Sequence, residues 1–96
     1  ALPHIIKHIY NNGTDEVIRR GKKIHGLSYV ELVEHEALLS SITFRVRDDL
    51  YNTYYKVYIQ KYNDPKLISM RCGCPYNIGE ICRHEVAALL RLQDMI

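Results

Sequence analysis

The sequence predicts an α+β fold, with N-terminal helices, an antiparallel sheet of three to four strands and a closing helix. Three observations predict this class: apolar residues at helical spacing near both ends, alternation of apolar and polar residues in the middle, and three cysteines gathered near the C-terminus. Strands that follow one another apart from the helices are typical of α+β domains. The 96 residues fit one compact module with a thin core.

The first segment, residues 1–26, is predicted as a helical lead-in. Isoleucines recur at helical spacing within residues 3–11, which predicts a short helix that begins near Pro3. A second helix can be capped by Thr14, with acidic residues in the first turn, where the helix dipole favours them. We expect this second helix to end at Gly21.

The middle segment, residues 27–71, is predicted as the sheet. Strands are expected at residues 28–34, 42–47, 54–62 and 67–72, because apolar and polar residues alternate there. Residues 48–52 have the composition of a turn. The last segment, residues 72–96, contains the cysteines and then a helix over about 83–94.

The cysteines and one histidine form a pattern typical of a metal site. Zinc prefers four ligands in tetrahedral geometry, commonly thiolates and imidazoles, and the four candidates are Cys72, Cys74, Cys82 and His84. Residues at i and i+2 of an extended segment point to the same face, so the first two cysteines can turn toward one ion. Three cysteines are an odd number, which a pure disulfide framework would leave unpaired. An iron–sulfur cluster is the alternative, although such clusters prefer four cysteines.

The positive charge lies away from this pattern. The net charge is +2, and residues 1–26 carry five basic and two acidic groups, whereas residues 72–96 carry two basic and three acidic groups. The candidate nucleic-acid contacts are therefore Arg19, Arg20, Lys22, Lys23, Arg45, Arg47 and Lys56. The alternative is that they form only a solvated helix end and an ordinary outer sheet face.

The metal pattern and its surroundings resemble the SWIM zinc finger. The resemblance rests on the Cys-x-Cys and Cys-x-His pairs, with Pro75 after the second cysteine and Val86-Ala87 after the histidine, and extends upstream over roughly residues 19–92. It implies a ββα-like finger whose zinc ligands are the four residues above. One departure is Glu85, which stands where members of the family often carry an apolar residue.

The resemblance further implies a non-catalytic module of a bacterial Swi/Snf-type helicase-like ATPase that binds or targets DNA. The alternative is a protein-interaction adaptor within a larger enzyme. We expect no catalysis by this chain, because four protein ligands leave the zinc no open position and no phosphate-binding loop is present. No small-molecule substrate is expected, and the lack of an apolar run of about 20 residues predicts no membrane partner.

The absence of a signal-peptide pattern favours an intracellular, cytoplasmic location, where thiols stay reduced. The chain begins with Ala1 rather than methionine, so we expect a fragment of a longer protein.

Overall fold

The computed structural model describes residues 2–75 and 81–96. Within these residues the chain forms three α-helices and one four-stranded antiparallel sheet, so the predicted α+β class is confirmed. The helices are α1 (Pro3–Asn12), α2 (Asp15–Gly26) and α3 (Arg83–Met95). The strands are β1 (Val30–Glu36), β2 (Ser41–Arg47), β3 (Tyr54–Gln60) and β4 (Ser69–Cys72), and a short 3-10 turn, η1 (Ala37–Leu39), joins the first two.

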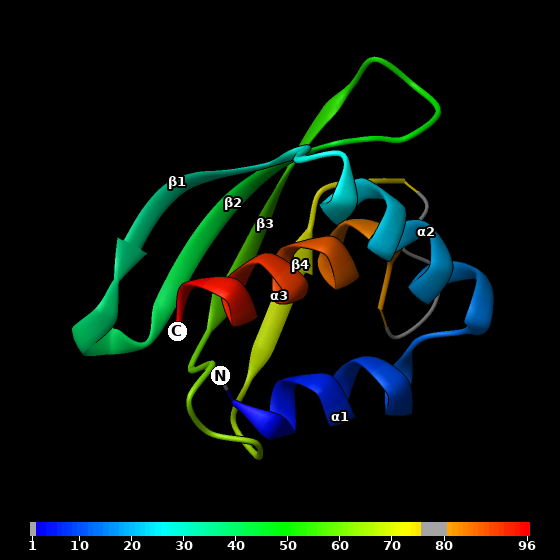
Figure 1. Cartoon of the computed structure of the whole chain (residues 1–96). Coiled ribbons are helices and arrows are strands. Elements are labelled where there is room, and N and C mark those ends of the chain that lie inside the picture. Colours follow the sequence, from blue (N-terminus) through cyan, green and yellow to red (C-terminus); the bar gives the residue numbers. More distant parts are fainter. Residues whose placement is uncertain (1, 76–80) are drawn as a thin grey trace.

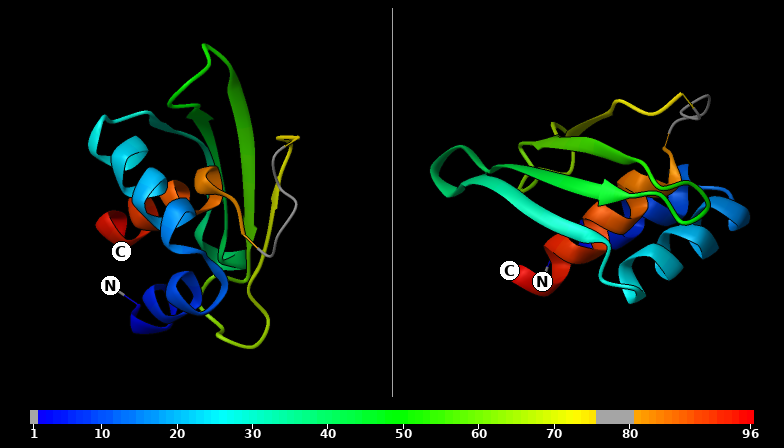
Figure 2. Two further views of the ribbon diagram at one scale, coloured as in Figure 1. Left: turned by 90° about the vertical axis from the view of Figure 1, so that its right-hand side faces the viewer. Right: turned by 90° about the horizontal axis from the view of Figure 1, so that it is seen from above.

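The strands lie side by side in chain order, and the helices cover one face of the sheet (Figure 1). The view from above in Figure 2 shows the sheet as one layer and the helices as a second layer beneath it. None of the described residues forms a helix on the opposite face of the sheet. None of the helices within the described residues has the length and apolar content needed to cross a membrane.

The core lies between the two layers, and it follows from the alternation in the strands. Ile42, Phe44 and Val46 of β2 pair with residues of β3 and are buried, whereas the residues between them are less buried. Helix α3 packs against all four strands and both other helices, and its residues Arg83–Leu89 are buried on every side. The helix that was predicted at the end of the chain is therefore the centre of the fold.

Helix α2 is longer than predicted. It continues through Gly21 and ends at Gly26, because Gly21 does not end the helix but lets it approach α3 closely. A Cβ atom at position 21 would lie 2.5 Å from Cβ of Val86 and 3.1 Å from the carbonyl oxygen of Arg83. The first strand begins at Val30, two residues later than predicted, because the turn at Ser28 (φ 62°) precedes it.

The loop between β2 and β3 contains the turn that the sequence predicted for residues 48–52, and it also places a carboxylate in the core. Asp48, its first residue, is 2% exposed and accepts hydrogen bonds from the backbone N–H groups of Leu50 and Tyr51 at 2.9 and 3.0 Å. Its own N–H group donates to the carbonyl of Thr53 at 2.9 Å. The loop thus has a fixed shape that places one buried carboxylate beside α3.

Candidate metal centre

The four predicted metal ligands lie together in the structure. Cys72 ends β4, Cys74 follows it in the loop, Cys82 precedes α3, and His84 lies in the first turn of that helix. One ligand atom from each residue lies within 4.8 Å of the others, and all four residues are buried. Residues 76–80, between the two ligand pairs, lie outside the described residues.

The geometry suits a single tetrahedral ion. Nδ1 of His84 lies 3.8 Å from Sγ of Cys72 and 3.9 Å from Sγ of Cys82. These separations are slightly longer than the roughly 3.5 Å between a nitrogen and a sulfur ligand that lie about 2.0 and 2.3 Å from one tetrahedral zinc ion. The donor set of three thiols and one imidazole is also one that zinc prefers. The structure therefore confirms a Cys3His cluster that can hold a metal ion and is compatible with a zinc finger.

The start of α3 is held by Glu85, the residue that departs from the resembled family. Its carboxylate accepts a hydrogen bond from the backbone N–H of Cys82 at 2.9 Å, which is one half of a capping box. Glu85 is 2% exposed, so its burial is compensated by this bond. An apolar residue here would leave that N–H group without its partner, and the ligand Cys82 would be less firmly placed.

Asp48 orients the histidine ligand. Its carboxylate oxygen Oδ1 lies 2.7 Å from Nε2 of His84, and a carboxylate accepts, so Nε2 carries the proton. The other ring nitrogen, Nδ1, then has a free lone pair that faces the thiols. A carboxylate behind a metal-binding imidazole is the usual second layer of such sites, because it fixes both the tautomer and the ring orientation.

Asp48 stays ionised in this buried place because several donors surround it. Burial opposes ionisation, but hydrogen bonds from the Leu50 backbone, His84, the Tyr51 backbone and Arg83 outweigh it and lower the pKa of Asp48 to about 2. Arg83 donates from Nε at 2.9 Å and also from Nη2. The buried negative charge is thus matched by a buried positive charge, as burial of ions requires.

The neighbouring Asp49 connects the same loop to α2. It accepts two hydrogen bonds from the guanidinium of Arg20, at 3.1 and 2.7 Å, and lies 3.3 Å from Nε of Arg83. Burial opposes ionisation of Asp49, but the hydrogen bond from Arg20 outweighs it, so its pKa is lowered. Two adjacent aspartates therefore connect the β2–β3 loop to the middle of α2 through Arg20 and to the start of α3 through Arg83 and His84.

The sequence did not identify Asp48, Asp49 or Arg83 as part of the site. Asp48 and Arg83 are 35 residues apart, and a pair of acids in a turn-like segment predicts only a turn. The one available signal is that Arg83 stands between two ligands, where a charged residue that becomes buried needs a partner of opposite charge.

The predicted nucleic-acid contacts fall into two separate groups. Arg19, Arg20, Lys22 and Lys23 lie on α2, in the helical layer, whereas Arg45, Arg47 and Lys56 lie on the sheet. Arg20 is engaged by Asp49, Arg19 by Glu16 at 3.0 Å, and the ammonium of Lys22 lies 5.5 Å from the centre of the Tyr10 ring. The structure does not bring the two groups together.

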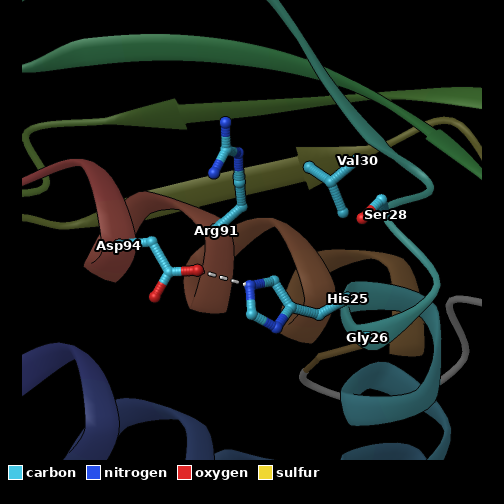
Figure 3. A pocket seen from close by; sticks show the side chains of 6 residues that line it. All are labelled: His25, Gly26, Ser28, Val30, Arg91 and Asp94. Carbon is cyan, nitrogen blue, oxygen red and sulfur yellow. Dashed lines mark hydrogen bonds and ion pairs between the residues drawn. The ribbon is translucent and has the colours of Figure 1, made fainter.

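A hollow of about 400 Å³ lies apart from the metal cluster, where the end of α2 meets the C-terminal half of α3 and the start of β1 (Figure 3). Nε2 of His25 lies 2.7 Å from the Asp94 carboxylate there, while Arg91 lines another wall. Within the described part of the chain, no group of three or more potential metal ligands lies in this hollow, because the Cys3His cluster is the one such group found.

Comparison of the chain with protein-family models, with curated proteins and with solved structures found no match. The buried Cys3His cluster and the α+β fold therefore stand on the structure alone.

Proposed function

We propose that this chain is a non-catalytic zinc-binding module of the SWIM type that contributes to DNA binding or targeting by a larger helicase-like ATPase. The observation that carries the proposal is the buried Cys3His cluster with its supporting carboxylate, Asp48. The pattern of the ligands in the sequence supports the SWIM assignment. The parent enzyme and the DNA role follow from that resemblance.

A structural role for the metal is supported by what the ligands join. Cys72 ends β4 and Cys74 follows it, whereas Cys82 precedes α3 and His84 lies in its first turn. An ion bound by all four would connect the sheet to the central helix and would have no free coordination position for water, which catalytic zinc retains. When bound, the ion supplies cross-linking rather than polarisation of a substrate.

The contribution to DNA binding is supported by charge. Of the cations on α2 and on the sheet, Arg20 and Arg47 are partly buried and the others are exposed, and each exposed cation that meets a phosphate releases a counterion and adds to affinity at low salt. The metal segment carries more acidic than basic groups. We therefore place the DNA contact on other surfaces than the cluster itself.

Metal analysis of the purified full chain tests the first part of this proposal. We expect one zinc ion per chain, and we expect the substitution His84→Gln to lower the occupancy, whereas His25→Gln keeps it because His25 lies outside the cluster. A metal-free chain that folds normally, or equal loss in both variants, would refute the metal site. Titration with labelled DNA at low and moderate salt tests the second part.

The alternative function, a protein-interaction adaptor, is favoured by one observation. Four apolar side chains along the first hairpin are exposed, namely Leu32 and Val33 on β1 and Leu38 and Leu39 on η1. Exposed apolar surface of this kind is typical of protein contacts. Loss of partner binding on substitution of Leu38 and Leu39 by serine, in a chain that shows no DNA binding at low salt, would favour this adaptor function.

A further inference from the structure

The outer face of the sheet, which no helix of residues 2–75 and 81–96 covers, carries a distinctive mixture of side chains. The registers place Arg45 opposite Lys56, and Thr43 opposite Tyr58, which in turn lies opposite Arg71. The outward residues of β2, β3 and β4 are Ser41, Thr43, Arg45, Arg47, Tyr54, Lys56, Tyr58, Gln60, Ser69 and Arg71. This set contains four cations and no carboxylate.

The tyrosines of this face are open and the cations lie over them. Tyr54 is 52% exposed and Tyr58 is 37% exposed. The guanidinium of Arg45 lies 4.9 Å from the centre of the Tyr54 ring, and that of Arg71 lies 5.2 Å from the centre of the Tyr58 ring. Planar aromatic surface and positive charge are thus interleaved along β3, as on surfaces that stack bases and attract the backbone between them.

A hollow opens between β3 and β4 on the same part of the sheet. It has a volume of about 250 Å³ and is lined by Tyr58, Gln60, Ser69, Met70 and Arg71. Its lining offers an aromatic ring, an amide, a hydroxyl and a guanidinium. These are the groups that stack on an unpaired base and form hydrogen bonds with its edge.

Charge limits where a phosphate backbone can run. Lys56 and Arg71 form no ion pair with any described residue, whereas Arg45 is paired with Glu31 of β1 at 2.7 Å. The outward side chains of β1 include Glu31, Glu34 and Glu36, and these acids would repel a phosphate. A negatively charged strand is therefore directed toward β3 and β4, away from β1.

We propose that the outer face of β3 and β4 binds single-stranded nucleic acid, with bases stacked on Tyr54 and Tyr58 and phosphates at Lys56 and Arg71. This inference rests on the proposed nucleic-acid function and names the surface and the strand form. A duplex hides the faces of its bases, so it cannot use the two tyrosines in this way. The two tyrosines are four positions apart, which corresponds to about 13 Å along the strand.

The test is titration of the zinc-loaded full chain with a labelled oligothymidine of about 15 nucleotides and with a duplex of equal length, at low salt. We expect tighter binding of the single strand. The substitutions Tyr54→Ala and Tyr58→Ala should each weaken it by about 5- to 150-fold, the effect of losing one stacked base. Tyr10→Ala is the matched control, because Tyr10 is 54% exposed but lies on α1, and it should bind as the unmodified chain does.

Two further measurements keep the surface testable if a variant folds poorly. Arg71→Gln should lower the slope of log affinity against log salt by about 0.7. Amide resonances of β3 and β4 in the unmodified chain should move on titration, while those of α1 stay in place.

Three outcomes would overturn the inference in different ways. If the tyrosine variants bind normally while substitution of the α2 cations by glutamine abolishes binding, the surface is wrong but the DNA function stands. If the duplex binds at least as tightly as the single strand, the strand form is wrong. If no nucleic acid binds at low salt, the DNA function fails together with this inference, and the adaptor function is favoured.

Discussion

The two ends of the sheet differ in what holds them together. At one end, β4, the β2–β3 loop and the start of α3 surround the metal cluster, and every residue from Ile81 to Leu89 is buried. At the other end, β1 continues into η1 (Figure 1), and only Val30 of β1 is buried. Leu38 of η1 is 100% exposed.

This difference shows that the stabilising interactions of this small chain are concentrated at one end of the sheet. A module of 96 residues has a thin core that buries little apolar surface. A metal cross-link supplies additional stability to such a small fold. Here the link and the paired ions of Asp48 and Asp49 lie where the central helix begins. The far hairpin depends mainly on its ladder with β2, so the end with the metal cluster should control the stability of the whole chain.

Removal of the metal should have the largest effect. Structural zinc contributes on the order of 10 kcal/mol in small finger peptides, which is comparable with the whole stability of a domain. We expect a chelator, or the substitution Cys74→Ser, to remove amide-exchange protection from α3 and from the strands that pack on it, with recovery when zinc returns to the unmodified chain. Retained protection in α3 after metal loss would show that the cluster does not control the fold.

Asp48→Asn should have the next largest effect. The substitution removes the negative charge of the carboxylate that accepts hydrogen bonds from both His84 and Arg83. Breaking a buried ion pair in this way lowers the free energy of unfolding by about 3–5 kcal/mol. Metal affinity should also fall by about 10- to 100-fold, as for other carboxylates behind a metal ligand. Competition with a chromophoric chelator measures the affinity.

Asp49→Asn is the matched control for that change. It weakens the pair with Arg20 but does not touch His84, so stability should fall while metal affinity stays close to that of the unmodified chain. An equal loss of metal affinity in the two variants would mean that Asp48 acts through the general stability of the loop and not through the histidine.

Gly21→Ala tests the contact between α2 and α3 beside the cluster. The new Cβ would lie 2.5 Å from Cβ of Val86, and overpacking of this kind costs about 1–3 kcal/mol. Gly26→Ala is the control, since nothing lies within 4 Å of a Cβ there, and it should be neutral or add up to about 1 kcal/mol. Urea unfolding measures the stability of both variants. Loss of stability in Gly21→Ala alone would show that the contact between α2 and α3 requires glycine, whereas similar values for the two variants would contradict it.

The failed prediction at Gly21 shows which kind of information the sequence lacks. Within a sequence, a glycine after a helical segment predicts an end, because local propensity is all that can be compared. In the structure the same glycine is required by Val86, which is 65 positions further along the chain. The sequence indicated correctly that position 21 needs a glycine. The reason is close packing of α2 against α3 and not the end of the helix.

The candidate site likewise has residues that the sequence predicted and residues that it could not predict. Its four ligands were predictable because metal ligands share one chemistry and lie in two short pairs. The alternation in residues 42–47 likewise predicted the buried face of β2. Asp48 was not predictable, because its role depends on a contact with residues 35 and 36 positions away. The central place of α3 was missed for a related reason, since a helix at the end of the chain gives no sign of how many elements pack on it.

Metal affinity should also depend on pH. A hydrogen bond with the Cys72 thiol and burial raise the pKa of Cys82, so this thiol is protonated at neutral pH before the metal binds. Binding of the metal releases that proton, and affinity should therefore fall as the pH falls, by at least about tenfold per pH unit. Chelator competition between pH 6 and pH 8 measures the slope, and a flat profile would contradict the assignment of Cys82 as a thiolate ligand.

Leu38→Ser should have the smallest effect and tests the other half of the comparison. Leu38 is fully exposed, so the substitution removes no buried apolar surface, and the free energy of unfolding should change by no more than about 0.5 kcal/mol. Leu89→Ala, in the centre of α3, should cost about 2–5 kcal/mol in the same urea measurement, because that side chain is completely buried. If Leu38→Ser instead destabilises the chain by more than about 1 kcal/mol, the far hairpin takes part in the stability of the fold, and the contrast between the two ends of the sheet is wrong.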